Sequence, residues 1–255
     1  MTGARISQAL SEIRMGFLIL TRIPVGSIAG EAPTMGASAW CWPLVGLATG
    51  GLSALVWLFA QHLGLPPLPA AALAVLTGVL ATGGLHEDGL ADLTDGFWGG
   101  RDKDRRLAIM RDSHIGSYGA LAIGFSLLIR VGALASLTAC SGALALIALA
   151  AASRGMMPTA LHLLPAARAD GLGRAAGQTG GARVWVALAL AAAALLPFGL
   201  RVALLTGALM AGAALALGLL ALRRIGGQTG DVLGAMQQWA EMAGWLAISA
   251  LLTRG

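Results

Sequence analysis

Long apolar runs separated by short polar segments dominate the chain. Most runs approach the roughly 20 residues that a helix needs to cross the hydrocarbon core of a bilayer. They are continuous and lack the alternation of β-strands, so the pattern favours membrane helices over a β-barrel. The predicted spans are residues 39–61, 68–85, 118–140, 143–164, 184–200, 202–222 and 239–252.

The remaining periodicity lies near the N-terminus, where residues 11–20 form an amphipathic segment that we expect to lie in the membrane interface. Pro165 and Pro197 mark ends or bends of helices. The N-terminus lacks the apolar core and cleavage site of a signal peptide, so we expect insertion through the chain's own spans. The predicted fold is an all-α polytopic membrane bundle of about seven transmembrane helices, a single integral-membrane catalytic domain over residues 1–255.

Composition supports the membrane class. The chain is 57% hydrophobic and 11% charged, with a mean hydropathy of +0.77, whereas soluble domains carry about 25% charged residues. Its 37 glycines suit helices whose backbones approach closely in a bilayer. Cys41 and Cys140 have no paired spacing or companion His, which favours small buried hydrophobes over a metal site or a disulfide.

The basic residues orient the predicted bundle. A pI near 10.5 would suggest nucleic acid in a soluble protein, but here the bases lie in loops between spans, so we predict no nucleic-acid partner. With a cytoplasmic N-terminus and seven crossings, 13 of the 17 basic residues fall inside and two, Arg201 and Arg254, outside. This asymmetry predicts a cytoplasmic N-terminus and a cytoplasmic active face.

A cluster of acids follows the second predicted span. Asp88, Asp92 and Asp95 are spaced i, i+4 and i+7, which puts three carboxylates on one face of a helix. Neighbouring anions repel one another unless a cation lies between them, and Mg²⁺ prefers such oxygens. Glu87 and these three make up a third of the chain's twelve acids. We predict Glu87, Asp88, Asp92 and Asp95 as metal ligands; a solvated helix end is the alternative.

His86 precedes these acids directly. It is a candidate general base, a candidate metal ligand, or a cap of the preceding span. We predict the catalytic residues as His86, Asp88, Asp92 and Asp95.

A basic, glycine-punctuated segment comes next. Its bases are Arg101, Lys103, Arg105, Arg106 and Arg111, with Arg130 further along. Arginine offers forked donors that match phosphate oxygens. A loop that is basic only to orient the protein is the alternative, but it leaves the polar run 111–119 unexplained. Acids for a metal followed by bases for phosphate, at the end of a membrane helix, indicate an enzyme that acts on a diphosphate.

Three further positions carry candidate chemistry. Asp231 at the Gly-rich turn 226–235 is either a metal or substrate contact or a helix cap. Arg154, inside a predicted span, needs an acid or a substrate phosphate. Arg130, near the start of a span, is able to snorkel to the interface.

These segments resemble the cobalamin synthase family, the adenosylcobinamide-GDP ribazoletransferases. The likeness includes the signature at 86–96, the segment at 105–116, the amino-terminal motif at 17–25 and the short motif at 42–46. Residues 168–173 and 229–235 also match family segments. His114 stands where many members have Arg. The matches run in the family's order over nearly the whole chain.

The resemblance implies the last assembly step of cobalamin biosynthesis in the cytoplasmic (cell inner) membrane. Such transferases use Mg²⁺ to join adenosylcobinamide-GDP to α-ribazole or its 5′-phosphate and release GMP. It also implies contact with membrane lipid and association with other cobalamin-assembly enzymes, and the Gly/Ala-rich surface permits a homo-oligomer. The predicted substrate-binding residues, for phosphate, corrinoid or ribazole, are Arg22, Arg105, Arg106, Arg111, Arg154 and Asp231.

Two other functions remain as alternatives. A CDP-alcohol phosphotransferase also places spaced aspartates at a helix end, but its motif has a Gly/Ala-Arg insertion that residues 86–96 lack. A cation-coupled transporter would place acids near the bilayer midplane in both halves of a pseudo-repeat. The reaction product distinguishes the CDP-alcohol phosphotransferase, which makes a lipid, from the predicted transferase, which makes a corrinoid.

Overall fold

The computed structural model describes residues 2–28, 30–168 and 179–252. The regular secondary structure of these residues is helical, apart from one isolated bridge between Ala166 and Gln228, so the all-α class is confirmed. The helices are α1 (Thr2–Leu20), α2 (Met35–Ser38), η1 (Ala39–Cys41), α3 (Trp42–His62), α4 (Pro67–Thr82), α5 (Leu85–Gly99), α6 (Lys103–Ile109), α7 (Ser117–Ala135), α8 (Ala139–Leu163), α10 (Gly181–Leu195), η2 (Leu196–Phe198), α11 (Leu200–Ile225) and α12 (Gly230–Leu252).

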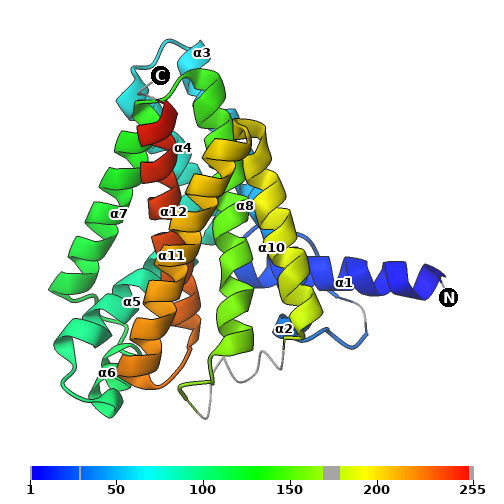
Figure 1. Cartoon of the computed structure of the whole chain (residues 1–255), viewed down its shortest axis with the longest axis vertical. Helices are drawn as coiled ribbons and strands as arrows, with labels where there is room; N and C mark the ends of the chain where they lie inside the picture. The colour runs from blue at the N-terminus through cyan, green and yellow to red at the C-terminus, as the bar shows by residue number, and fades with distance from the viewer. Residues whose placement is uncertain (1, 29, 169–178, 253–255) are drawn as a thin grey trace.

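The long helices form a bundle around α8. Helices α7, α8, α10, α11 and α12 run along the long axis of the molecule, and α5 and α6 gather at one end (Figure 1). Helix α8 is the most buried candidate span. Small residues of both helices let α3 approach α8 closely. A Cβ added at Gly46 of α3 would lie 2.2 Å from the carbonyl oxygen of Ala150 in α8. Small residues therefore set the helix spacing.

Helix α1 projects from the side of the bundle, across its long axis (Figure 1). It begins at Thr2, well before the predicted segment 11–20. The buried carboxylate of Glu12 anchors it, accepting hydrogen bonds from Trp40 Nε1 (2.6 Å) and Arg183 Nη2 (3.2 Å). The transverse orientation of α1 fits a helix at the membrane interface.

Five helical segments have the length and apolarity to cross a membrane: Met35–His62, Ser117–Ala135, Ala139–Leu163, Gly181–Phe198 and Leu200–Ile225. The bent pair α4–α5 would make a sixth. The seventh predicted span, 239–252, belongs to a longer helix that begins at Gly230 and does not reach the same apolarity. Its first half carries the polar residues Asp231, Gln237, Gln238 and Glu241.

The bend between α4 and α5 comes from two successive glycines. Gly83 and Gly84 have φ of 67° and 72°, a left-handed conformation that side chains with a Cβ rarely adopt. The two helices meet at 86°. The apolar stretch predicted to end at residue 85 thus ends at Thr82, and the acidic segment turns away as a separate helix.

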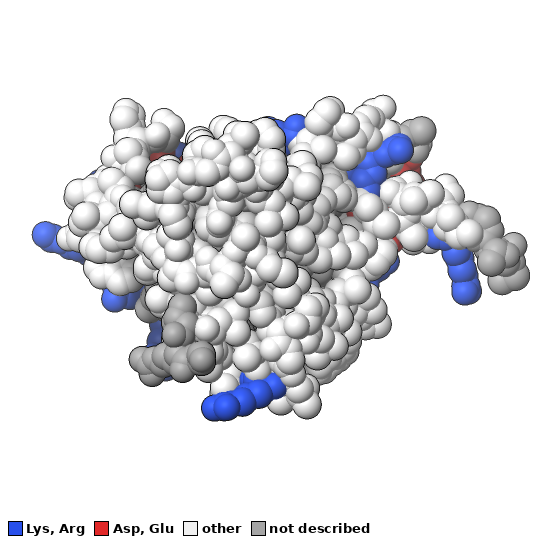
Figure 2. Space-filling model, turned by 90° about the horizontal axis from the view of Figure 1, so that it is seen from above, with Lys and Arg blue, Asp and Glu red and all other residues white. Residues whose placement is uncertain are grey.

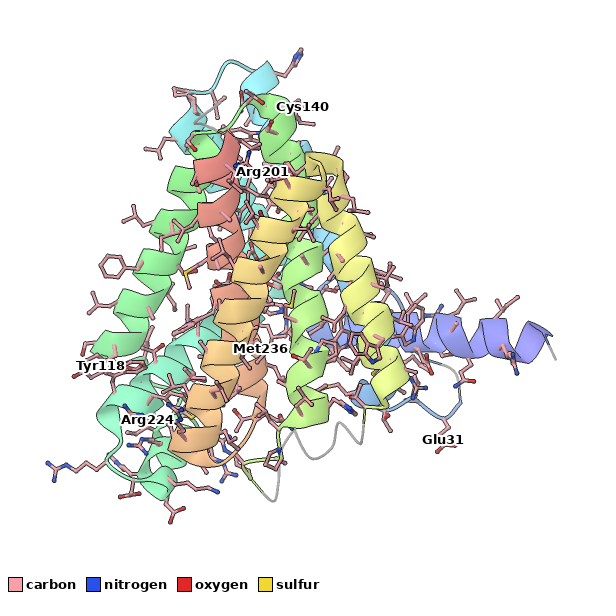
Figure 3. All side chains as sticks on the ribbon, viewed as in Figure 1. Glu31, Tyr118, Cys140, Arg201, Arg224 and Met236 are labelled. Atoms are coloured by element: carbon pink, nitrogen blue, oxygen red, sulfur yellow. The ribbon has the colours of Figure 1, made fainter. Side chains whose placement is uncertain are left out.

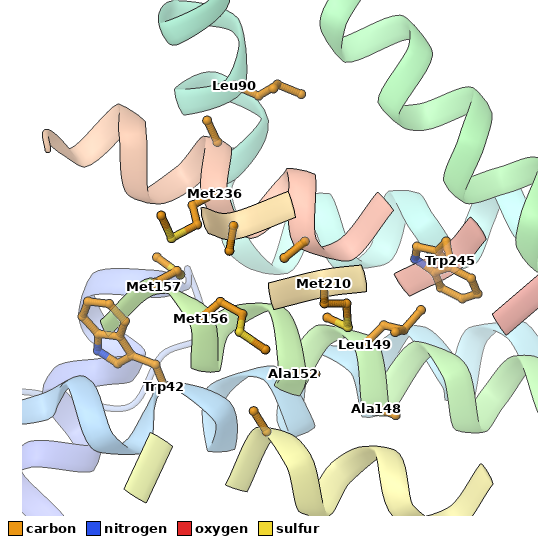
Figure 4. Close-up of a cluster of buried hydrophobic side chains, with 14 of the residues drawn as sticks. Trp42, Leu90, Ala148, Leu149, Ala152, Met156, Met157, Met210, Met236 and Trp245 are labelled. Atoms are coloured by element: carbon orange, nitrogen blue, oxygen red, sulfur yellow. The ribbon is translucent and has the colours of Figure 1, made fainter. Parts of the chain in front are cut away.

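Methionine and tryptophan side chains pack among the alanines and leucines of the core (Figure 4). Trp42 lies near Met156 and Met157 at one end of this cluster, and Trp245 lies near Met210 and Leu149 at the other. Trp42, Met210 and Trp245 are at most 1% exposed. Unbranched methionines adapt to the gaps between large indole rings.

Charged side chains are distributed unequally between the two ends of the bundle. Figure 3 places Arg201 and Cys140 at one end, and Arg224 and Tyr118 at the other, beside α5 and α6. Seen from above, the first end is almost free of charged side chains, and basic residues show at its rim (Figure 2). The basic segments 101–111 and 223–224 therefore share one end, as predicted.

Candidate functional site

Helix α5 carries the acidic segment and packs against α12 and α7. Gly89 makes the contact with α12 close, because a Cβ there would lie 3.0 Å from the carbonyl oxygen of Asp231. The predicted helix is confirmed, but its aspartates differ in surroundings. Asp88 is exposed, Asp92 is partly buried and Asp95 is buried.

Asp95 holds the N-terminus of α7. Its Oδ2 accepts the backbone N–H of Gly116 at 2.7 Å, and its Oδ1 accepts that of Gly119 at 2.9 Å. These are donors that the first turn of a helix leaves without partners. A Cβ at either glycine would lie within 2.4 Å of the carboxylate. Asp95 therefore caps α7, and its role as a metal ligand stays a prediction.

The other two aspartates lie near a third from α12. Asp92 feels the negative charges of Asp88 and Asp231. The positive charge of Arg168 partly offsets their repulsion at Asp92. Arg168 Nη2 lies 3.8 Å from Asp231 Oδ2 and donates to the carbonyl of Leu107 at 3.0 Å. Three carboxylates and one guanidinium therefore gather where α5, α12 and the segment after α8 meet.

Glu87 faces the bundle interior instead. It is 7% exposed, and its Oε1 accepts hydrogen bonds from Arg130 Nη2 (2.9 Å) and Gln238 Nε2 (3.1 Å). A carboxylate engaged in this way is the buried partner of a cation. Arg130 pairs with Glu87 rather than snorkelling to the interface, and the metal-ligand role of Glu87 stays a prediction.

This ion pair belongs to a larger buried network that spacing alone did not reveal. Gln238 accepts from Ser126 Oγ at 2.7 Å. Gln237 donates to Ser153 Oγ at 2.9 Å and to Glu241. The signal was present in the sequence as polar residues next to an apolar span, which are functional or paired by default.

His86 lies between this network and the aspartates. It is 1% exposed, and its Nε2 has no hydrogen-bond partner among the described residues. The side chain borders both a small polar cavity of about 40 Å³ within the bundle and a larger one beside Asp88. His86 is therefore close to the candidate site but aimed at neither a helix cap nor an acid.

Arg154 and Arg22, two of the predicted substrate-binding residues, lie in different parts of the structure. Arg154 is buried in α8, where Nη1 donates to the carbonyl of Ala150 at 2.9 Å, and it lines the small polar cavity with His86. Arg22 is exposed, and its backbone N–H donates to the carbonyl of Ala81 at 2.8 Å. Its side chain lies across Gly83, at the bend that precedes α5.

The arginines of the basic segment differ in their contacts. Arg106 donates to the backbone carbonyls of Arg224 (3.0 Å) and Arg101 (3.1 Å), so it ties α6 to the end of α11. Arg105 and Arg111 are exposed on the same side of the molecule's end. Arg106 therefore stabilises the fold, and the exposed pair remains the candidate for phosphate.

His114 forms a surface pair in the loop before α7. Its Nδ1 lies 2.6 Å from Asp112 Oδ1, and both side chains are exposed. The hydrogen bond between them raises the pKa of His114 and lowers the pKa of Asp112. A cation therefore persists to higher pH at this position than for an isolated histidine.

A cavity of about 260 Å³ opens beside the aspartates. Asp88, Asp231 and His86 border it, together with Gly89 and the first turn of α12. Its other walls are apolar: Ile19, Leu20, Met35, Trp42, Leu85, Met157 and Leu233. Helices distant in sequence thus form an apolar pocket with carboxylates at one side.

No three His, Cys, Asp or Glu side chains of the described residues form a preformed metal group. Mg²⁺ commonly binds one or two carboxylates and completes its shell with substrate phosphate and water. Asp88, Asp92 and Asp231 carry oxygens of this kind and lie within electrostatic range of one another. Asp170, in the segment 168–173 that resembles the family, lies outside the described residues.

Arg168 is the residue that sequence reasoning missed. It lies in the loop after α8, shortly before Asp170. Its position in the sequence has no periodic relation to the residues of α5. The bridge between Ala166 and Gln228, with Gln228 N–H donating to Pro165 at 2.8 Å, brings it to Asp231. A resemblance of both segments to one family was the single signal available.

Comparison with known proteins identifies the family. The profile described as cobalamin-5-phosphate synthase matches residues 12–249. A protein of Azorhizobium caulinodans is 49% identical over 94% of this chain and 95% of its own length, and one of Mesorhizobium japonicum is 42% identical over 96% and 95%. Both are named adenosylcobinamide-GDP ribazoletransferase. No solved structure gives a significant match.

The profile covers the acidic helix, the basic segment and the turn that carries Asp231, and the relatives extend over nearly the full chain. The chain belongs to the cobalamin-5-phosphate synthase family.

Proposed function

We propose that this chain is an adenosylcobinamide-GDP ribazoletransferase that acts in the final assembly step of cobalamin. It joins adenosylcobinamide-GDP to α-ribazole, or to α-ribazole 5′-phosphate, and releases GMP. The relatives' shared name supports the reaction. The observation that carries it in the structure is the group Asp88, Asp92, Asp231 and Arg168 beside a pocket.

The reaction exchanges one phosphorus–oxygen bond for another. A ribose hydroxyl oxygen of α-ribazole bonds to the phosphorus attached to adenosylcobinamide, and the bond from that phosphorus to the GMP oxygen breaks. GMP leaves with the electron pair. The hydroxyl proton passes to whichever of Asp88 and Asp231 the metal does not engage, with His86 as the alternative acceptor. Arg168 stabilises charge that develops on the leaving group.

Asp88 and Asp92, with Asp231, are the residues we propose to hold Mg²⁺ against the diphosphate. The bound ion would supply charge neutralisation at the phosphoryl oxygens. Asp95 keeps α7 in place beside them, and Glu87 fixes the inner face of α5 through Arg130. Both are positioning residues in this proposal.

Exposed arginines near α5 bind the remaining phosphate charge. Arg22 at the α4–α5 bend and Arg105 and Arg111 after α5 are the candidates. Arg154 is 4% exposed and lies deeper, where it borders the polar cavity with His86. We infer that Arg154 acts through the buried network rather than on phosphate.

The protein is proposed to reside in the cytoplasmic membrane with this end in the cytoplasm. The concentration of basic residues at the end that carries α5 and α6 supports that orientation. A transporter is disfavoured because the aspartates lie at one end of the bundle instead of at its middle. A CDP-alcohol phosphotransferase is disfavoured by family membership.

Turnover by the purified protein in lipid nanodiscs tests the proposal. With adenosylcobinamide-GDP, α-ribazole and Mg²⁺, we expect equal amounts of cobalamin and GMP, and no product after EDTA treatment. Asp88→Asn should lower kcat on the order of 100-fold. Asp104→Asn, an exposed acid of α6, is the matched control and should retain activity. A folded wild-type protein that forms no cobalamin would contradict the proposal.

A further inference from the structure

We propose that the 260 Å³ cavity between α1, α3, α5, α8 and α12 binds the heterocyclic base of the acceptor riboside, and that the corrinoid lies outside it. The inference rests on the proposed function and assigns the two substrates to different parts of one site.

Size is the first argument. Pockets that enclose drug-sized ligands measure roughly 300–1,000 Å³, so this cavity of about 260 Å³ accommodates a bicyclic ring. A corrin macrocycle with its amide side chains is several times larger. The compact bicyclic groups of the two substrates are the base of α-ribazole, a dimethylated benzimidazole, and the purine bases of adenosylcobinamide-GDP, so size excludes the corrin ring and leaves these bases.

The chemistry of the walls is the second argument. Ile19, Met35 and Leu85 offer accessible apolar surface, which favours a planar methylated ring over a polar base. Methionines are able to repack around such a ring. A guanine base would leave its amide groups without partners on these walls, at a cost in binding free energy.

The polar side of the cavity is the third argument. His86 borders this cavity, and its buried Nε2 has no partner among the described residues. Asp88 and Asp231 border the same cavity. A base seated on the apolar wall would direct its ribose towards these two carboxylates, where the attacking hydroxyl has to lie.

Matched tryptophan substitutions on α1 test the assignment. Ile19 lines the cavity, whereas Leu18 beside it faces outward and is 45% exposed. We expect Ile19→Trp to fill the cavity and raise the KM for α-ribazole at least tenfold, with the KM for adenosylcobinamide-GDP changed less than twofold. Leu18→Trp should leave both constants unchanged. Met35→Trp provides a second cavity-filling variant if Ile19→Trp does not fold.

Binding without turnover separates this inference from the proposed function. Isothermal titration of α-ribazole into nanodisc-embedded wild type should give a Kd that Ile19→Trp weakens by a similar factor, and inosine should bind far more weakly. If wild-type protein forms cobalamin but Ile19→Trp and Met35→Trp raise only the KM for adenosylcobinamide-GDP, or neither KM, the pocket assignment is wrong while the function stands. Absence of wild-type turnover overturns the function instead.

Discussion

Asp88, Asp92 and Asp95 share a helix face and yet do different things. Asp95 is covered by the first turn of α7, and both its oxygens accept backbone N–H groups. Asp88 is exposed beside the pocket, and Asp92 lies between the charges of Asp88 and Asp231. A side chain's role within such a cluster therefore depends on which neighbouring element covers it.

Substitution at Asp95 should separate stability from catalysis. Asp95→Ala removes the acceptor of two helix N–H groups and should lower stability by about 1–2 kcal/mol. Thermal unfolding in detergent, followed by circular dichroism, measures the change. Remaining activity should follow the folded fraction. Asp92→Asn, by contrast, should unfold near the wild-type temperature while losing turnover. Wild-type stability with no activity in Asp95→Ala would instead make Asp95 a metal ligand.

At the scale of elements, glycines decide how closely helices pack. Gly46 and Gly50 lie on the face of α3 that meets α8. A Cβ at Gly50 would lie 2.5 Å from the carbonyl oxygen of Leu146. Neighbouring Gly51 has open space where a Cβ would be. Both lie in the same apolar run, so composition does not distinguish them, although i to i+4 spacing of Gly46 and Gly50 is typical of a close helix interface.

The pair Gly50 and Gly51 offers a matched test of this contact. Gly50→Ala should destabilise the protein by about 1–3 kcal/mol, because backbone atoms of α8 have to move. Gly51→Ala should be neutral or slightly stabilising, since alanine is the better helix former. Thermal stability of the two variants in one detergent compares them. Equal unfolding temperatures would contradict the close α3–α8 contact.

For the molecule as a whole, the separation of charge predicts its orientation. The only reactive natural thiol expected is Cys140, which is exposed at the end opposite α5, whereas Cys41 is buried. An impermeant maleimide added to intact spheroplasts should label Cys140. In a Cys140→Ser background, Ser113→Cys in the loop before α7 should react only in inverted membrane vesicles. The reverse pattern would place the aspartates outside the cytoplasm.

Local sequence patterns were enough to predict the structural class. Apolar run length, basic loops and the acidic segment sufficed for a membrane helical bundle with one charged end, because each depends on local pattern. The family resemblance, carried by short ordered motifs, was confirmed by the matched profile. The i, i+4, i+7 spacing correctly predicted a helix for Asp88, Asp92 and Asp95.

Tertiary structure alone decided which polar groups meet. Glu87 pairs with Arg130 from α7, and Arg168 reaches Asp231 across a bridge between Ala166 and Gln228. These contacts join residues far apart in the chain, so no local spacing encodes them. Two left-handed glycines turned α5 out of line with α4. That turn gives α5 one face towards the bundle and another towards the pocket, which is why neighbouring acids have different roles.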